Sequence, residues 1–209
     1  MGTVVPIDKG VTLCIFAKPP RPGQVKTRLA ASVGTVRAAA LASAFLADSW
    51  AVPWGRKIIA TPEPDFDFGL GAERWDQGSG DLGARIARIL GRAAPGIAIG
   101  ADSPGFPLAA LCDAAAAVGR GEAALGRARD GGFWLLGLPR CPEGLLADLP
   151  WSTDGTAEAT ELRLEARGFR VHRVDPWFDI DDADDLAHFR RRVPVGHAPQ
   201  TWSALGGQG

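Results

Sequence analysis

The amino-acid sequence predicts a single α/β domain whose sheet is mostly parallel but mixed, with helices on both faces. Short apolar runs of strand length alternate along the chain with longer segments whose apolar residues recur at helical spacing. The chain has 209 residues, enough for one sizeable core and short for two ordinary domains. We expect the domain to span residues 11–193, between an N-terminal extension at residues 1–10 and a flexible tail at residues 194–209.

The first elements are a strand, a loop and a helix. Residues 11–17 are a compact apolar run, and Pro19 and Pro20 keep the next segment out of a helix, so a buried strand leads into a loop. Residues 35–50 are rich in alanine, a strong helix former. The candidate core contacts of this helix are Val36, Leu41, Phe45 and Leu46. We expect the helix to pack back against the first strand.

The same alternation continues to the end of the domain. Asp81 and Pro107 suit helix starts, because aspartate is a preferred N-cap and proline is favoured in the first turn. Further strands are expected at residues 56–61, 73–77, 96–101, 122–126, 133–138 and 169–174. Further helices are expected at residues 81–93, 107–118, 157–167 and 183–192. In the first of these helices the expected core face is Leu82, Ile86, Ile89 and Ala93.

Composition limits the functions open to the chain. Hydrophobic residues make up 46% of it and charged residues 22%, as in folded globular proteins. A formal net charge of −1 gives no global attraction to nucleic acid or to an anionic membrane, so we expect neither partner. No apolar run approaches the ~18 residues of a membrane span. Three cysteines without a C-x-x-C pair, and a start that lacks the apolar core of a signal peptide, favour a cytoplasmic protein.

Residues 17–28, AKPPRPGQVKTR, are typical of a phosphate-binding loop. The segment contains no acid and four cations, which are Lys18, Arg21, Lys26 and Arg28. Gly23 lets backbone amides approach a ligand, and the loop follows a strand at the edge where open parallel sheets bind ligands. This combination suits a di- or triphosphate. A solvated basic loop held by its prolines is the alternative.

Two carboxylates indicate a divalent-metal site. Asp102 follows the strand expected at residues 96–101. Strand-like alternation places Asp179 and Asp181 on one face while Ile180 points into the core. Carboxylate oxygens are the ligands preferred by Mg²⁺ and Mn²⁺, so we expect Asp102 and Asp181 to bind one of these metals. Asp179 takes the second place if the register is shifted, and capping of a turn or helix is the alternative role.

Six ordered motifs resemble those of one bacterial family. They are CIFAKPPRPGQVKTRL at residues 14–29, QGSGDLG at 77–83, GADSPG at 100–105, DGGFWLLGL at 130–138, PWST at 150–153 and DIDDADDL at 179–186. The chain resembles the bacterial glycosyltransferase-like proteins of the nucleotide-diphospho-sugar transferase superfamily, which are related to the molybdenum-cofactor and phospholactate nucleotidyltransferases. The likeness covers residues 13–189. It differs at Ser103, where the family usually has cysteine, and at Asp154, where glutamate is commoner.

The resemblance implies a glycosyltransferase-A-type, Rossmann-like fold and a requirement for Mg²⁺ or Mn²⁺. The nucleotide-binding residues that it implies are Ala17, Lys18, Arg21, Gly23, Lys26, Arg28, Gln77 and Gly83, the last two at the base. Its implied metal ligands are Asp102 and Asp181. Its implied catalytic residues are Asp102, Lys26 and Asp130, with Asp130 on the acceptor side; a simple Asp-Gly turn is the alternative for Asp130.

The activity expected is transfer from a nucleotide-activated donor to a small-molecule acceptor. Glycosyl transfer from an NDP-sugar is favoured, because the motifs match glycosyltransferase-like proteins best. Nucleotidyl transfer from an NTP to a phosphorylated acceptor, which releases pyrophosphate, would use the same residues. A nucleotide-binding protein without catalysis is the non-enzyme alternative. The sugar, base and acceptor are not specified, and a homodimer stays open.

A competing pattern is the G-x-G-x-x-G of Gly78, Gly80 and Gly83, which in isolation suggests a dinucleotide-binding fold. Residues 73–77 before it are too polar for the central strand of such a fold. A serine hydrolase is disfavoured as well, because the histidines lie outside the motifs and no nucleophile elbow is present.

Overall fold

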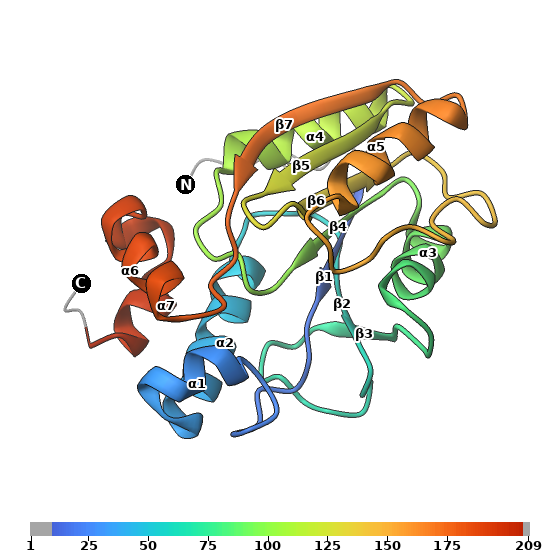
Figure 1. Ribbon diagram of the computed structural model, residues 1–209. Coiled ribbons are helices and arrows are strands. Elements are labelled where there is room, and N and C mark those ends of the chain that lie inside the picture. Colours follow the sequence, from blue (N-terminus) through green and yellow to red (C-terminus); the bar gives the residue numbers. More distant parts are fainter. Residues whose placement is uncertain (1–9, 207–209) are drawn as a thin grey trace, which may run out of the picture.

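Seven strands form one sheet in the order β3-β2-β1-β4-β6-β5-β7 in the computed structural model, which describes residues 10–206 (Figure 1). The strands are β1 Thr12–Phe16, β2 Lys57–Thr61, β3 Glu73–Asp76, β4 Gly96–Gly100, β5 Ala123–Ala128, β6 Phe133–Leu138 and β7 Val171–Trp177. β6 is antiparallel to both of its neighbours, and the other neighbouring pairs are parallel. The carboxyl ends of all strands except β6 therefore share one edge of the sheet.

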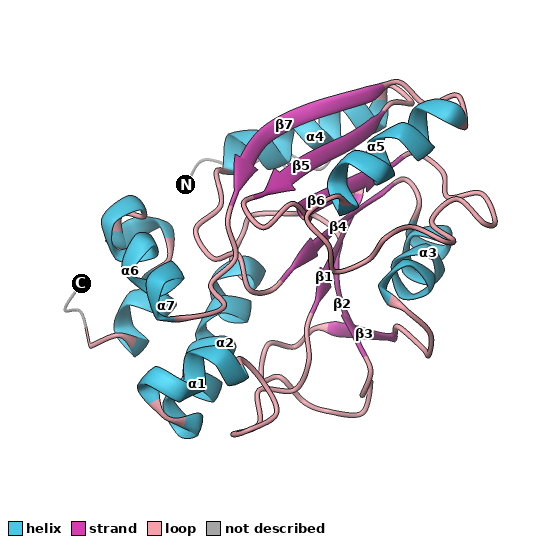
Figure 2. Cartoon of the chain, viewed as in Figure 1, coloured by secondary structure: helices cyan, strands magenta, loops and turns pink. Residues whose placement is uncertain are grey.

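Helices cover both faces of this sheet (Figure 2). They are α1 Thr27–Val33, α2 Thr35–Trp50, α3 Leu82–Ala93, α4 Leu108–Gly119, α5 Thr156–Ala166, α6 Ala183–Arg192 and α7 Pro199–Ala204. The side chains of β1 alternate between the faces, so that Leu13 and Ile15 join the apolar cluster of α4 while Cys14 joins that of α3. The predicted fold class is confirmed: one α/β domain with a mostly parallel, mixed sheet between helical layers.

The expected strands and helices within residues 11–193 are all present. Asp81 caps α3 as predicted, because its side chain accepts a hydrogen bond from the Ala84 N–H at 2.8 Å. Two expected core contacts are exposed instead, Val36 by 72% and Leu82 by 44%. Both lie in the first turn of their helix, and helical spacing does not tell where along its length a helix meets the sheet.

The C-terminal segment is folded, contrary to the flexible tail expected from residue 194. A 3-10 turn, Val195–His197, leads into α7. Buried Asp48 of α2 accepts hydrogen bonds from the backbone N–H groups of Gln200 at 2.9 Å and Thr201 at 2.8 Å, and from the Thr201 hydroxyl at 2.6 Å. A carboxylate that satisfies the first N–H groups of a helix fixes that helix in place. Residues 207–209, and all but residue 10 of the expected N-terminal extension, lie outside the described residues.

A third apolar cluster lies beside the sheet and joins α1, α2, α6 and α7. Ile180, which follows β7, is fully buried in this cluster, as its place in the alternating pattern predicted. Its burial holds the segment after β7 against the rest of the domain. Within residues 10–206, no helix has the length and apolar character needed to cross a membrane.

Candidate active site

A cavity of about 750 Å³ opens at the carboxyl edge of the sheet, where β1 and β4 lie side by side. Ala17 and Lys18, which follow β1, line it together with Ala101 and Asp102, which follow β4. The strand order reverses here, because β2 lies on one side of β1 and β4 on the other. Open α/β sheets bind ligands at such a switch point, and the volume suits a nucleotide.

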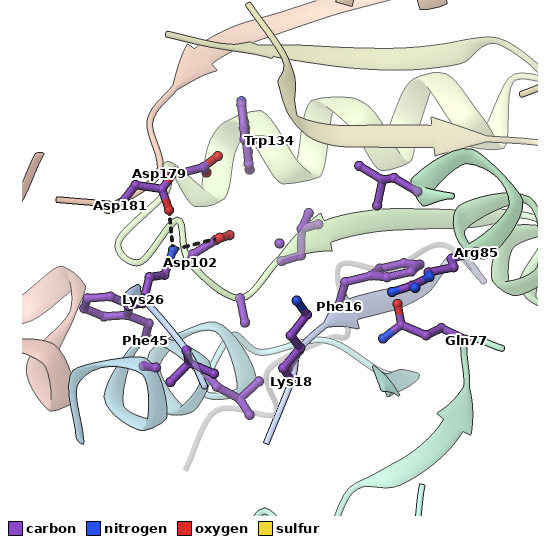
Figure 3. A pocket seen from close by; sticks show the side chains of 18 of the residues that line it. Phe16, Lys18, Lys26, Phe45, Gln77, Arg85, Asp102, Trp134, Asp179 and Asp181 are labelled. Carbon is purple, nitrogen blue, oxygen red and sulfur yellow. Dashed lines mark hydrogen bonds and ion pairs between the residues drawn. The ribbon is translucent and has the colours of Figure 1, made fainter. Parts of the chain in front are cut away.

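Lys26 joins two carboxylates at one end of this cavity, as Figure 3 shows. Its Nζ atom donates to Asp102 Oδ2 at 2.9 Å and to Asp181 Oδ1 at 2.8 Å, and its side chain is 11% exposed. Arg28 donates from Nη2 to Asp181 Oδ2 at 2.6 Å. Four residues expected at the site, two at the start of α1 and one each after β4 and β7, are therefore in direct contact.

The charges of this cluster support one another. Burial by itself would lower the pKa of Lys26, but the carboxylates of Asp102 and Asp181 outweigh burial and raise it. Burial also opposes the charged form of Asp181, yet Lys26 and Arg28 hold the pKa of Asp181 below its ordinary value. Lys26 and Asp181 are therefore both charged at neutral pH.

The backbone at Lys26 has an uncommon conformation. Its φ of 47° and ψ of 48° lie in the left-handed region, and the residue is the N-cap of α1. A residue other than glycine costs ~1 kcal/mol or more in this region, so the surrounding structure must hold it. The turn ends the basic loop and carries the ammonium group to the two carboxylates.

Asp179 lies beside the cluster and is turned toward Ser103. The Ser103 hydroxyl donates a hydrogen bond to Asp179 Oδ1. Burial and the neighbouring charge of Asp102 raise the pKa of Asp179 to about 7. Ser103 thus ties the segment after β4 to the segment after β7. Asp181, and not the substitute Asp179, shares Lys26 with Asp102.

The other end of the cavity carries Phe16, Gln77 and Arg85, which lie near one another in Figure 3. Gln77 is buried, and Arg88 closes its loop by donating to the Gln77 carbonyl. Arg85 donates from Nε to the Gly80 carbonyl at 2.9 Å. An aromatic ring, an amide and a guanidinium can together stack on and hydrogen-bond to a nucleobase. Sequence reasoning missed Phe16 and Arg85; the position of Arg85, one turn after the predicted cap of α3, was the available signal.

Lys18 lies between these two ends of the cavity. Within residues 10–206, its ammonium group makes neither an ion pair nor a hydrogen bond to another side chain. Lys26 and Arg28, by contrast, already neutralise carboxylates. Of the three basic-loop cations that line the cavity, Lys18 is thus the most available to a phosphate.

Arg21 and Gly23 of the basic loop are not among the residues that line this cavity. Arg21 forms a bidentate ion pair with Glu63, with Nη1–Oε1 and Nη2–Oε2 distances of 2.6 and 2.8 Å. Its guanidinium also lies 5.1 Å from the ring centroid of Phe66. The basic segment itself contains no acidic residue, and the partner of Arg21, Glu63, comes from the loop after β2. Gly23 lies in an exposed turn with a φ of 79°.

Gly83 also lies outside the cavity, on the side of α3 that faces a loop. A Cβ atom there would lie 2.5 Å from the carbonyl oxygen of Leu146 and 2.6 Å from the ring of Trp151. The glycine permits close packing rather than approach to a base. The dinucleotide-binding alternative fails as well, because β3, which precedes this glycine pattern, is an edge strand.

A second cavity of about 300 Å³ adjoins the first, since Arg28, Asp179 and Asp181 line both. Asp130 lines this second cavity and not the first. Its Oδ1 atom accepts a hydrogen bond from the Gly132 N–H at 2.9 Å, which makes the turn expected for an Asp-Gly sequence. Asp130 therefore faces the second cavity, which adjoins the main cavity beside Asp181.

The donor atoms of Asp102 and Asp181 suit a divalent metal. Within residues 10–206, no three His, Cys, Asp or Glu side chains are arranged to hold a metal ion by themselves. Magnesium, however, is commonly bound by one or two carboxylates together with water and substrate phosphates. Two carboxylates that converge on a single cationic atom fit that pattern.

Solved structures share this fold. The crystal structure of a "putative nucleotide-diphospho-sugar transferase" from Desulfovibrio desulfuricans G20 has a TM-score of 0.83 and 25% sequence identity, with 94% of each chain covered. Rv0371c from Mycobacterium tuberculosis H37Rv has a TM-score of 0.53 and 20% identity over 88% of this chain and 99% of that one. A structure of Rv0371c in complex with manganese gives 0.50 and 19% over 88% and 100%.

Sequence comparison is more limited. No curated protein matches the chain significantly. Residues 37–153, more than half of the chain, match the family described as "Uncharacterized protein conserved in bacteria (DUF2064)", and the protein belongs to that family.

Proposed function

We propose that the protein is a metal-dependent transferase that moves a glycosyl group from an NDP-sugar to a small-molecule acceptor. The observation that carries this proposal is the layout of the main cavity. Asp102, Asp181 and Lys26 form one end, and Gln77 and Arg85 form the other. A nucleoside diphosphate has the same layout, with a base at one end and phosphates with their cation at the other. The description of the D. desulfuricans protein and the manganese complex of Rv0371c support this class.

The cations of the cavity bind the diphosphate in this proposal. Lys18 has no partner among the described residues to give up, and Lys26 lies next to the metal-binding carboxylates. A divalent metal held by Asp102 and Asp181 would supply a Lewis acid for the charge that develops on the leaving diphosphate. One preorganised hydrogen-bond donor placed next to such a developing charge stabilises the transition state by ~3 kcal/mol.

The acceptor enters through the second cavity, beside Asp181 and Asp130. Its hydroxyl oxygen forms a bond to the anomeric carbon, and the bond from that carbon to the diphosphate oxygen breaks. The nucleoside diphosphate leaves with that electron pair. The proton of the hydroxyl passes to Asp130, whose Oδ2 atom is not used in the turn.

The charge of the second cavity favours glycosyl over nucleotidyl transfer. Arg28 and Arg129 are its cationic lining residues. The acidic ones are Asp130, Asp179, Asp181, Asp182 and Asp185. A phosphorylated acceptor, which nucleotidyl transfer requires, would meet this excess of carboxylates, whereas a neutral hydroxyl compound would not. Nucleotidyl transfer therefore ranks second, and nucleotide binding without turnover ranks third.

The experiment that tests the proposal combines binding with turnover. Calorimetry would measure the affinity for nucleoside diphosphates and NDP-sugars with and without Mg²⁺ or Mn²⁺. An acceptor screen would then follow release of nucleoside diphosphate from NDP-sugars and of pyrophosphate from NTPs. Asp130→Asn should retain donor binding and lose turnover, and Asp113→Asn, on the exposed face of α4, should retain both. Pyrophosphate release would establish nucleotidyl transfer, and binding with no turnover of any acceptor would leave a binding protein.

A further inference from the structure

The ammonium group of Lys26 occupies the point on which Asp102 and Asp181 converge. Its Nζ atom is 2.9 Å from one carboxylate and 2.8 Å from the other, and its side chain is mostly buried. A divalent cation bound by both carboxylates would require the same space. An ammonium and a metal ion cannot both sit between two oxygens, because their positive charges repel at that distance.

We infer that Lys26 is an internal counter-cation. It holds Asp102 and Asp181 together while no divalent metal is bound. A divalent metal displaces it from the two carboxylates, and it then pairs with the phosphates of a bound nucleotide. This inference rests on the proposed metal-dependent function. Without a cation between them, the two carboxylates would repel each other and the ends of β4 and β7 would lose their ionic link. The lysine therefore holds the two carboxylates close to each other in the metal-free protein.

Lys26 is suited to this role in ways that its neighbours are not. Among the described residues, it is the one cation with bonds to both carboxylates, since Arg28 contacts Asp181 and Lys18 contacts neither. Its four-carbon side chain can swing while the backbone stays fixed in its left-handed turn. When Lys26 leaves, Arg28 still neutralises the second oxygen of Asp181.

This arrangement couples the binding of metal to the binding of nucleotide. A metal that binds alone must displace Lys26 into solvent. A metal that binds with a nucleoside diphosphate gives Lys26 a new anionic partner. Each ligand should therefore strengthen the binding of the other, and Lys26 should carry part of that coupling.

The test uses Mn²⁺ binding to the full chain, followed by electron paramagnetic resonance. Lys26→Met should bind Mn²⁺ about tenfold more tightly than the wild type in the absence of nucleotide, because a competing charge is gone. Lys18→Met removes the same charge from the same cavity without touching the carboxylates, and its Mn²⁺ affinity should stay within about twofold of the wild type. Adding Asp102→Asn to Lys26→Met should abolish the gain. Equal or weaker Mn²⁺ binding by Lys26→Met would overturn the inference.

A second measurement needs no variant and stands even if Lys26→Met folds poorly. Acetylation of lysines by a water-soluble reagent, followed by mass spectrometry, would report the exposure of Lys26, with Lys57 as internal reference. Saturating Mg²⁺ without nucleotide should raise the Lys26 rate several-fold, and nucleoside diphosphate should lower it again. A Lys26 rate that Mg²⁺ leaves unchanged, although Mg²⁺ binds, would contradict the displacement.

The inference and the proposed function fail separately. If nucleoside diphosphates bind in a metal-dependent manner but Lys26→Met gains no Mn²⁺ affinity, the counter-cation role is wrong and the proposed function stands. If Lys26→Met gains Mn²⁺ affinity but neither protein binds any nucleotide, the counter-cation role stands and the proposed function is wrong.

Discussion

The backbone N–H of Ile180 donates a hydrogen bond to the carbonyl oxygen of Asp102 at 2.9 Å. This bond joins the segment after β7 to the segment after β4, although the two strands are not neighbours in the sheet. Because Ile180 is fully buried, the bond is shielded from water. The segments that carry the carboxylates of Asp102 and Asp181 are thereby held next to each other.

Removal of the Asp102 charge should impair metal-dependent binding. We expect Asp102→Asn to weaken the Mg²⁺-dependent affinity for a nucleoside diphosphate at least about tenfold, because a proposed metal ligand is lost and Lys26 loses a partner. The affinity for the nucleoside alone should change little. Calorimetry with and without Mg²⁺ measures both, and Asp113→Asn controls for the loss of a charge elsewhere. Unchanged metal-dependent binding would contradict the assignment of Asp102.

Two cations of the basic loop should differ in their importance. Lys18→Ala should weaken nucleoside diphosphate binding by ~1–2 kcal/mol, since Lys18 lines the cavity without a partner among the described residues. Arg21→Ala should have a smaller effect, because Arg21 is bound to Glu63 outside the lining. Titration calorimetry of the two variants side by side makes the comparison. A larger loss for Arg21→Ala would show that Arg21 leaves Glu63 for the phosphates.

Gly83 and Gly91 of α3 should respond oppositely to alanine. Gly83→Ala should lower the free energy of unfolding by ~1–3 kcal/mol, because its Cβ would meet Leu146 and Trp151. Gly91→Ala has open space and should be neutral or stabilise by up to ~1 kcal/mol. Urea denaturation of both variants measures this. If Gly83→Ala were stable but bound nucleotide poorly, the contact with the base implied by the sequence would be correct.

Asp48 should anchor the C-terminal helix. Asp48→Ala should lower the free energy of unfolding by ~2–3 kcal/mol, because three hydrogen bonds to α7 are lost and its first N–H groups are left without a partner. The variant should also be cut faster by protease near residue 199. Urea denaturation and timed proteolysis provide the measurements. Asp113→Ala, exposed on α4, should match the wild type in both.

Glu161 should make stability depend on pH. Burial by itself would raise its pKa, but hydrogen bonds from Arg127 and Arg173 outweigh burial and hold the pKa below its ordinary value. A carboxyl with a lowered folded pKa stabilises the protein above its unfolded pKa, and this stabilisation is lost as the pH falls through the folded pKa. Glu161→Gln should therefore lower the free energy of unfolding by ~2 kcal/mol at neutral pH. That difference should shrink below about pH 4.

Urea denaturation across this pH range would follow the Glu161 effect. Exposed Glu158→Gln, on the same helix, should show no such pH-dependent difference. If Glu161→Gln lowered the free energy of unfolding by the same amount down to low pH, the charge of the Glu161 carboxylate would not contribute to stability.

Most of the fold could be predicted from the sequence, because its signals are local. Short apolar runs indicate strands, and longer segments whose apolar residues recur at helical spacing indicate helices. Residues such as Asp81 mark where a helix begins. The helix α7 was missed because its capping carboxylate, Asp48, lies far away in α2. A short segment without periodicity gives no sign that a distant side chain will fix it.

The site could be predicted in its residue types more than in its contacts. Lys26, Asp102 and Asp181 were identified because cations and carboxylates followed strands, and the strand ends meet at one edge. The pairing of Arg21 with Glu63 depends on how two loops pack, which no local pattern records. The role of Gly83 likewise depends on the Trp151 ring opposite it, which only the folded chain reveals.

The reversed direction of β6 bears on how this family could diversify. β6 enters the sheet at the edge where its neighbours leave it, so Phe133 and Trp134 at its start line the main cavity. The turn before β6, which contains Asp130, is short and joins two strands of the second half of the sheet. In the proposed reaction, evolution can therefore alter that turn, and with it the choice of acceptor, while the strands that present the proposed donor site keep their sequence.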